Sequence, residues 1–224
     1  MDICDFHSHI LPALDHGTES IDESLKQLAL ARKFGVSRIF ATSHFYPHKD
    51  SVEQFIAKRE ISYRSLMNEH DGLPEVRLGA EVLLCPGLDS MPGLESLCLS
   101  GTRHLLLELP FNDFSTEYVK TAKAIVSRGY NVILAHAERY DPDHVDLMLD
   151  VGAVIQLNAP AVATLFRKRS VNKWLAAGVV VAIGSDIHHA DPRAYKDFRT
   201  AVKRLGKYAD FVKKSSDEIW EQSK

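Results

Sequence analysis

Apolar residues occur along this chain in two kinds of segment that alternate from one end to the other. Short, continuously apolar runs are separated by longer segments in which apolar residues recur every three or four positions. Continuously apolar runs are typical of parallel strands buried on both faces, and the longer pattern is typical of amphipathic helices. The pattern predicts seven strands, at residues 2–6, 37–42, 76–81, 104–109, 131–136, 153–157 and 179–184.

Glycine stands between a predicted helix and the next strand at four places, Gly35, Gly129, Gly152 and Gly178. A glycine there accepts the left-handed conformation that ends a helix. Residues 82–103 are expected to form irregular turns and a short helix, and residues 194–222 one or two helices that close the domain. The alternation of strands and helices along the chain predicts an α/β domain, built either on an open doubly wound sheet or on a barrel.

The composition fits one soluble globular domain over residues 1–224, with 45% hydrophobic and 25% charged residues. The net charge of −3 gives no basic excess to hold nucleic acid. Three cysteines without a CxxC pair argue against a disulfide framework and favour the reducing cytoplasm. The first ten residues lack the features of a signal peptide, and no run approaches the roughly 18 apolar residues of a membrane span.

Polar residues that favour metal binding follow the predicted strands. They stand at or near the carboxyl end of each strand: His7, His9, His44, Glu81, Glu108, His136, Asn158, Asp186 and His188. In a β/α barrel the loops after the strands share one face, so all but Asn158 are expected as ligands of one site. So many imidazoles and carboxylates exceed the needs of one ion and predict two or three ions. Manganese, iron or zinc suits this shell better than magnesium or calcium.

Two of the candidate ligands leave alternatives open. Glu108 lies in the apolar stretch LLLELP, where a carboxylate needs a cation or a structural ion pair. His16 lies in the turn-like sequence DHG, where either Asp15 or His16 is a candidate helix cap, and the alternative for His16 is contact with the metals. The other histidines are interpreted as surface or hydrogen-bonded residues.

Two arginines, Arg139 and Arg193, stand close behind predicted ligands. They are either solvated surface charges or side chains that bind and stabilise a phosphate through paired hydrogen bonds, a role that would make them catalytic. Metals and arginines on one face predict a phosphate ester as substrate. Other phosphate chemistry has no support, because glycine-rich nucleotide loops and a GxSxG elbow are missing from the sequence. Cys98 and Arg103 have four residues between them, whereas a cysteine phosphatase loop needs five.

The motifs DFHSHILP, ATSHFYP, GAEV, AHAERY and GSDIHH follow one another through nearly the whole chain. In this order they resemble the polymerase and histidinol phosphatase (PHP) superfamily. Within it, the opening HSHILPALDHG and the HAERY stretch look most like the bacterial manganese-dependent tyrosine-protein phosphatases of capsular and exopolysaccharide loci. The resemblance implies a distorted seven-stranded, TIM-like β/α barrel with three metals at the carboxyl ends of its strands.

Carried over to this sequence, the resemblance assigns the ligands to three ions. The first ion falls to His7, His9, Glu81 and Asp186, the second to Glu81, Glu108 and His136, and the third to His44, His188 and the position of His16. The position of His16 is usually aspartate in this branch, so DHG in place of DDG is a departure. An imidazole can also ligate, but it lacks the negative charge.

The resemblance also implies a function. It indicates a manganese-dependent phosphatase that removes phosphate from tyrosine in a protein, in particular a membrane-associated bacterial tyrosine kinase that controls capsule or exopolysaccharide synthesis. Two alternatives remain. One is a histidinol-phosphate phosphatase or another small-molecule phosphoesterase, and the other is a non-catalytic binding module that keeps its metals for stability.

Overall fold

The computed structural model describes residues 3–72, 74–112 and 114–223. Its strands are β1 (Ile3–Ser8), β2 (Val36–Ala41), β3 (His44–Phe45), β4 (Glu75–Leu78), β5 (Glu81–Leu83), β6 (His104–Glu108), β7 (Asn131–Leu134), β8 (Val154–Asn158) and β9 (Val180–Gly184). All their pairings are parallel. Each predicted strand coincides with one of these or overlaps it, except that residue 2 of the first prediction lies outside the described residues.

Helices separate most of the strands, as predicted, although β3 follows β2 and β5 follows β4 without a helix between them. The helices are α1 (Ile21–Lys33), α2 (Val52–Met67), α3 (Thr116–Ser127), α4 (Pro142–Asp150), α5 (Ala159–Ala163), α6 (Arg169–Ala177), α7 (Pro192–Arg204) and α8 (Ala209–Gln222). Short 3₁₀ helices are η1 (Leu88–Ser90), η2 (Leu94–Leu97), η3 (Ala137–Arg139) and η4 (Gly206–Tyr208). The predictions for residues 82–103 and 194–222 are confirmed. All four predicted helix-ending glycines have φ between 69° and 97°.

The strands form two parallel sheets. The orders are β1-β2-β4 and β3-β5-β6-β7-β8-β9. The parallel α/β class is therefore confirmed, whereas a closed seven-stranded barrel is not, because the described residues form nine strands in two separate ladders. The sheets meet just beyond the end of β9, where the backbone N–H of Asp186 donates to the carbonyl of His7 at 2.8 Å.

The strand predicted at 76–81 divides between the two sheets. It separates into β4, which pairs with β2, and β5, which pairs with β3 and β6. Gly79 lies at the crossing, and a Cβ there would lie 2.7 Å from Cδ2 of Leu99. A side chain at this position would therefore require the Leu99 side chain to move.

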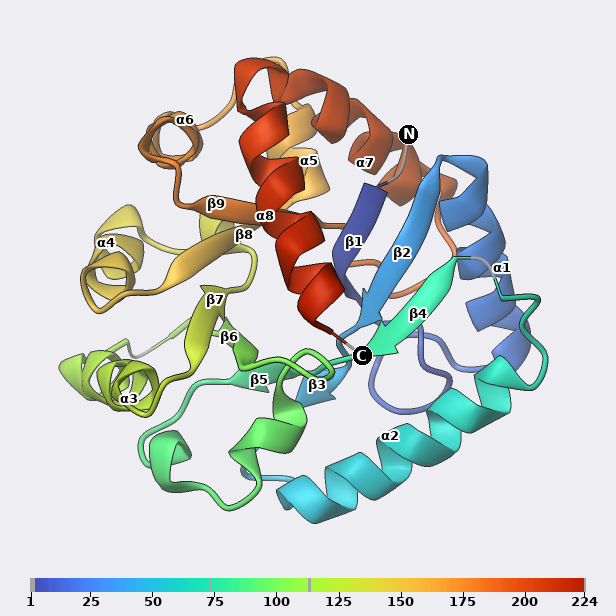
Figure 1. Ribbon diagram of the computed structural model, residues 1–224, viewed down its shortest axis with the longest axis horizontal. Coiled ribbons are helices and arrows are strands. Elements are labelled where there is room, and N and C mark those ends of the chain that lie inside the picture. The colour runs from blue at the N-terminus through green and yellow to red at the C-terminus, as the bar shows by residue number, and fades with distance from the viewer. Residues whose placement is uncertain (1–2, 73, 113, 224) are drawn as a thin grey trace.

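Both sheets contribute to one small apolar core. Its buried side chains come from strands of each sheet, from α8, and at Leu99 and Ala135 from loops beside the strands: Cys4, Phe6, Phe40, Leu99, Leu106, Ile133, Ala135, Ala182, Ile219 and Trp220. Figure 1 shows α8 crossing in front of the strands while α1, α2, α3, α4 and α6 lie around the outside. The last turns of α8 line a groove with the first residues of β6 and β7, so α8 covers the amino ends of these strands. The carboxyl ends carry the polar residues.

Candidate metal centre

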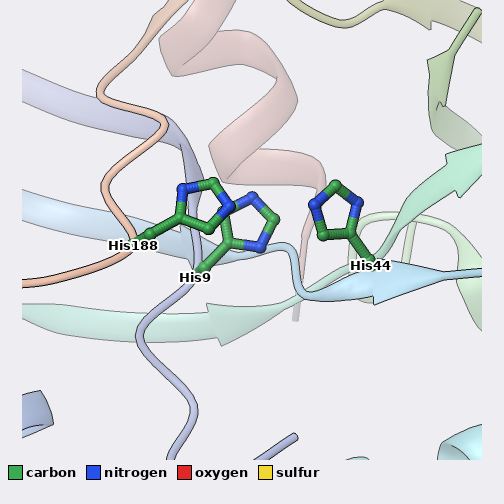
Figure 2. Close-up of side chains that lie close together, drawn as sticks. All are labelled: His9, His44 and His188. Carbon is green, nitrogen blue, oxygen red and sulfur yellow. The ribbon is translucent and has the colours of Figure 1, made fainter. Parts of the chain in front are cut away.

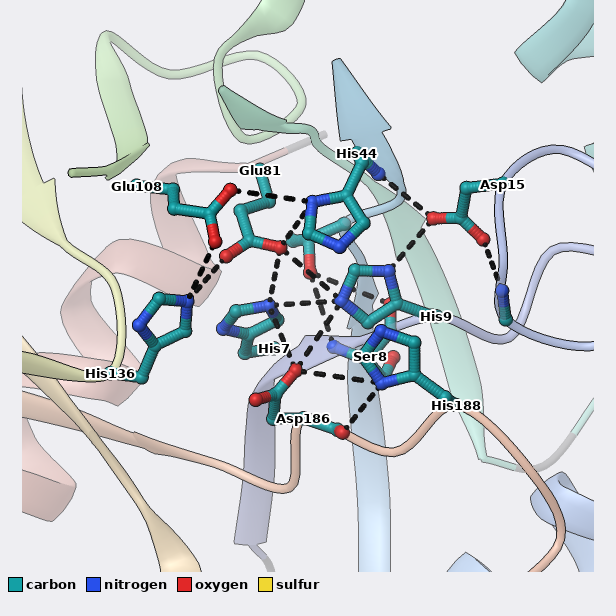
Figure 3. A network of polar contacts seen from close by, with 12 residues as sticks. His7, Ser8, His9, Asp15, His44, Glu81, Glu108, His136, Asp186 and His188 are labelled. Atoms are coloured by element: carbon teal, nitrogen blue, oxygen red, sulfur yellow. Dashed lines mark hydrogen bonds and ion pairs between the residues drawn. The ribbon is translucent and has the colours of Figure 1, made fainter. Parts of the chain in front are cut away.

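The residues predicted at the strand ends converge into one buried cluster (Figure 3). His7 lies in β1, and His9 follows that strand directly. Glu81 is the first residue of β5, Glu108 is the last residue of β6, and Asp186 follows β9. The strand ends thus bring together residues that are up to 179 positions apart in the chain, as the sequence predicted, although Glu81 begins β5 and does not end a strand.

Glu81 lies at the centre of this cluster, and its side chain is fully buried. Its Oε2 lies 3.1 Å from Nε2 of His7, 3.4 Å from Nε2 of His9 and 2.9 Å from Nδ1 of His44. Its Oε1 lies 2.6 Å from Nε2 of His136. Burial raises the pKa of Glu81, but the surrounding histidines outweigh burial and hold it well below the usual value. The two oxygens face different imidazoles, so this carboxylate is placed to bridge two cations.

The buried polar atoms of the cluster fit metal ions better than they fit each other. Nδ1 of His44, Nδ1 of His136, Nε2 of His188 and Oε2 of Glu81 are buried without an aligned hydrogen bond. Nε2 of His7 lies 3.1 Å from Nε2 of His9, and because Nδ1 of each ring faces an oxygen acceptor, the neutral rings would direct two Nε2 lone pairs at each other. Two ligands of one ion, each about 2.1 Å from it, are separated by roughly 3 Å. Lone pairs that meet at this distance suit a shared cation.

The candidate ligands fall into overlapping groups. Three sets have one ligand atom per residue within 4.8 Å of one another: His9, His44 and His188; His7, His9 and Glu81; and His44, Glu81 and Glu108. Figure 2 shows the first set, with the three imidazoles close together. Because the sets share members without coinciding, the cluster offers ligands for more than one ion.

Glu108 is the second carboxylate of the cluster. Its oxygens lie 3.7 Å from Nδ1 of His44 and 3.7 Å from Nε2 of His136. Burial, followed by the negative charge of Glu81, raises the pKa of Glu108 to about 7. Two buried carboxylates so close to each other favour a cation between them.

Asp15 is a residue of this site that the sequence reasoning treated only as a capping candidate. Its Oδ2 accepts from Nδ1 of His9 at 2.8 Å and from the backbone N–H of His44 at 2.9 Å, and its Oδ1 accepts from Gly17 N–H at 2.8 Å. Burial raises its pKa, but these bonds and His9 lower it further, to below the usual range. Asp15 follows the His7-x-His9 pair closely in the chain, and this short spacing is the feature of the sequence that could have indicated its place in the site.

His16 lies against the same histidines. Its ring centroid is 4.5 Å from that of His44 and 4.6 Å from that of His188. The imidazole is thus beside the first of the three candidate groups. A role of His16 as a ligand stays a prediction.

Gln156 and Asn158 connect two of the candidate ligands. Oε1 of Gln156 accepts from the backbone N–H of His136 at 2.8 Å and lies 3.2 Å from Nδ1 of His7. Its Nε2 donates to Oδ1 of Asn158 at 3.0 Å, and Nδ2 of Asn158 donates to Oδ2 of Asp186 at 2.8 Å. This buried chain of amides fixes the orientation of His7 and Asp186. Gln156 was missed, although a polar residue inside the apolar run AVIQLNA was a signal.

The backbone around the cluster is strained at two candidate ligands. His136 has φ 33° and Asp186 has φ 53°, in the left-handed region that residues other than glycine rarely adopt. Such conformations persist where surrounding contacts hold them, and they concentrate at functional sites. At Gly184 a Cβ would lie 2.5 Å from Cβ of His7, so glycine is required where β9 approaches β1.

The two predicted phosphate-binding arginines differ in their surroundings. Nη1 of Arg139 lies 3.2 Å from Oδ2 of Asp186, so its guanidinium is beside the cluster. Arg193 is 87% exposed in its side chain and pairs with Asp191, with Nη2 3.1 Å from Oδ2. The structure thus brings Arg139 to the candidate ligands and turns Arg193 toward Asp191. The phosphate-binding role of both stays a prediction.

Cys98 is poorly suited to a thiol mechanism. This side chain is buried, and burial raises its pKa to about 12. A thiol with so high a pKa is a poor nucleophile at neutral pH.

Parallel β/α units with overlapping histidine and carboxylate groups at the strand ends define an α/β protein with a candidate metal centre. Within this class, the chain belongs to the capsular polysaccharide synthesis family CpsB/CapC, whose sequence model it matches over residues 3–217. The resemblance to the capsular branch is thereby confirmed. Among the described residues, no helix is both long and apolar enough to cross a membrane.

Named relatives resemble this chain over most of its length. The tyrosine-protein phosphatase CpsB of Streptococcus pneumoniae is 28% identical over 206 residues, which cover 84% of each chain. The tyrosine-protein phosphatase YwqE of Bacillus subtilis strain 168 is 24% identical over 211 residues, 85% of this chain and 79% of that protein.

A solved structure resembles the fold. It comes from work on YwqE of Bacillus subtilis and CpsB of Streptococcus pneumoniae, described there as unique metal-dependent tyrosine phosphatases. The TM-score is 0.81, with 21% identity and coverage of 99% of this chain and 96% of the other. At this identity the likeness establishes the common fold.

Proposed function

We propose that this protein is a manganese-dependent protein-tyrosine phosphatase. The observation that carries the proposal is the buried carboxylate of Glu81, whose two oxygens face four histidines. Arg139 beside this cluster supplies a cation for an anionic substrate. Membership of the CpsB/CapC family, with relatives named tyrosine-protein phosphatases, supports phosphotyrosine as the ester.

The proposed ligand sets follow the motifs. One ion is held by His7, His9, Glu81 and Asp186, a second by Glu81, Glu108 and His136, and a third by His44, His188 and His16. The short distances around Glu81 and the ring contacts of His16 support this division. His44 also shares a candidate ligand group with Glu81 and Glu108, so it would contribute to the second set as well as to the third.

When bound, the ions supply an activated water and neutralise the phosphate charge. The residues of the chain perform the remaining work. Arg139 binds nonbridging phosphate oxygens, on which negative charge develops during transfer. Gln156 and Asn158 keep His7 and Asp186 in fixed orientations. The leaving group is a phenolate with a pKa near 10, so it needs less protonation than an alkoxide would.

The proposed substrate is the phosphorylated tyrosine of a membrane-associated bacterial kinase that controls capsule or exopolysaccharide synthesis. The family's description in terms of capsular polysaccharide synthesis supports this partner. We further propose that the two sheets are parts of one open, distorted barrel in a single domain over residues 1–224. The apolar core shared by both sheets supports this description.

Side-by-side assays test the proposed function. We expect the protein with added manganese to hydrolyse a phosphotyrosine peptide much faster than histidinol phosphate, and to lose activity with a chelator. Glu81→Gln should retain the fold but lose manganese and turnover, because it removes the shared carboxylate. Faster turnover of histidinol phosphate would indicate a small-molecule phosphatase. Manganese binding without turnover of either ester would indicate a binding module.

A further inference from the structure

An exposed aromatic side chain, Phe111, lies beside the candidate metal centre. It follows Glu108 by three residues, and 55% of its surface is exposed. Its ring is nearly parallel to that of His136, with 6.1 Å between centroids and 13° between planes. Single exposed apolar side chains are common on protein surfaces, and Phe111 is distinguished from the others by its place against a candidate metal ligand.

Neighbouring residues hold Phe111 in this position. Its ring contacts that of Tyr140, with centroids 5.6 Å apart. The hydroxyl of Tyr140 accepts a hydrogen bond at 3.0 Å from the backbone N–H of Leu109, which fixes the segment between Glu108 and Phe111. Cζ of Arg139 lies 4.9 Å from the centroid of the Phe111 ring. Phe111 is therefore in contact with a candidate metal ligand and with the proposed phosphate-binding arginine.

The chemistry of an aryl phosphate matches this arrangement. In such an ester the aromatic ring is one oxygen atom away from phosphorus. A phosphate bound between Arg139 and the ligands His136 and Glu108 therefore brings the ring of its ester within reach of Phe111. Aromatic rings that meet by stacking or edge contact gain stability beyond the burial of their surface. An alkyl phosphate carries no ring and gains nothing comparable.

We infer that Phe111 forms one wall of a subsite for the phenyl ring of the substrate, and that it sets a preference for aryl over alkyl phosphate esters. This inference rests on the proposed phosphatase function and adds a specificity-determining residue to it. Phe111 does not ligate metal and does not contact phosphate in this assignment. Its loss should therefore weaken ring binding alone.

Variants at this position test the inference. The substrates are a phosphotyrosine peptide and O-phosphoserine, each assayed with manganese at several concentrations. We expect Phe111→Ala to raise KM for the phosphotyrosine peptide about three- to tenfold, the size of one aromatic contact, with little change in kcat. The kinetic constants for phosphoserine should not change. Phe111→Leu should resemble alanine, because it keeps apolar volume without a ring, and Phe111→Tyr should restore the preference.

Phe211→Ala is the matched control. This phenylalanine is also exposed, at 46%, but it lies in α8. Its ring tip lies near Gly178, at the amino end of β9 and away from the ligands. The control should leave both substrates unaffected. Inhibition by inorganic phosphate should also be equal in wild type and Phe111→Ala, since phosphate carries no ring.

The outcomes separate this inference from the function on which it rests. Wild-type protein that hydrolyses neither ester with manganese would overturn both. If wild type hydrolyses the phosphotyrosine peptide but Phe111→Ala changes neither ester or both equally, the function stands and the ring subsite is wrong. A thermal melt of Phe111→Leu close to that of wild type shows that any selective loss does not come from unfolding.

Discussion

At the scale of single residues, Asp15 shows how one side chain orders several others. It accepts hydrogen bonds from the His9 ring and from the backbone of His44, and so ties two candidate ligands to one turn. A carboxylate on Nδ1 of a histidine also selects the tautomer whose Nε2 is open for a metal. Asp15 thus acts on the site by positioning its ligands.

Removal of Asp15 should weaken metal binding. We expect Asp15→Ala to lower manganese affinity about 10- to 100-fold, the usual effect of losing a carboxylate behind a histidine ligand, and Asp15→Asn to lower it less. Titration calorimetry with manganese measures this difference. Asp146→Ala, which removes an exposed carboxylate paired with Lys173, is the control. Unchanged affinity in Asp15→Ala would leave Asp15 as a turn residue only.

Arg139 should act on the rate, with the metals retained. We expect Arg139→Ala to lower kcat for a phosphotyrosine peptide about 10²-fold, because the donor that stabilises developing charge is lost. Metal content, measured by elemental analysis, should stay the same. Arg193→Ala is the informative companion variant, since Arg193 pairs with Asp191 in this structure. Normal turnover in the double variant would contradict phosphate binding by either arginine.

The candidate ligands were predictable because each lies at or near the end of an apolar segment that predicts a strand, and parallel strands direct their carboxyl ends to one face. Asp15 and Gln156 were harder to predict for opposite reasons. Asp15 lies in a turn, where caps and ligand partners have the same sequence pattern. Gln156 lies inside β8, and its function depends on hydrogen bonds to His7 and His136, which come from other parts of the chain. Such partners become visible only when strands are placed side by side.

At the scale of elements, the periodicity predicted where strands lie but not how they pair. The segment predicted as one strand at 76–81 contributes to two sheets, as β4 and β5. The sequence shows no interruption at the break, although only Val76 is buried in β4 whereas Glu81 and Val82 are buried in β5. The two-residue β3 was missed, since His44 and Phe45 are too few for any periodicity to appear. Pairing partners are a tertiary property, so a local pattern does not contain them.

Contact between β1 and β9 depends on the absence of a side chain at Gly184. We expect Gly184→Ala to destabilise the fold by about 1 to 3 kcal/mol and to lower manganese affinity, because its Cβ would overlap Cβ of His7. Urea denaturation and metal titration measure the two effects. Gly87→Ala is the control: its φ of 84° also strains alanine, but nothing lies within 4 Å of the added Cβ. Equal metal affinity in both variants would show that β9 tolerates displacement.

At the scale of the whole molecule, the metal centre lies where the two sheets meet. His7 belongs to the sheet of β1, whereas Glu81 and Glu108 belong to the sheet of β6. Ligands from both sheets around shared ions would fasten the sheets together at their carboxyl ends, as α8 does at the amino ends. Binding and folding should therefore be coupled.

The same centre should make the stability of the metal-free protein depend on pH. Burial lowers the pKa of His7, but Glu81 and Asp186 outweigh burial and raise it from 6.5 to about 9. His7 therefore keeps a proton in the folded, metal-free protein at a pH where the unfolded chain has lost it. The resulting stabilisation is complete below about pH 6.5 and is lost as the pH rises through 9. It amounts to on the order of 3 kcal/mol.

Metal should remove this dependence, since a ligating imidazole has already lost the proton that His7 would otherwise bind. We expect the free energy of unfolding, measured by urea denaturation in the presence of a chelator, to fall between pH 6.5 and pH 9. With saturating manganese the fall should disappear, and the protein should be more stable by about 2.7 kcal/mol at a hundredfold excess over Kd. His7→Asn without metal should show a smaller fall than wild type, and the remainder is expected from His9, whose pKa Asp15, Asp186 and Glu81 raise against burial. The prediction would be contradicted if the stability of the chelator-treated wild type stayed constant across this range. His7 would then be neutral in the folded protein, and the other histidines would balance the negative charge of Glu81.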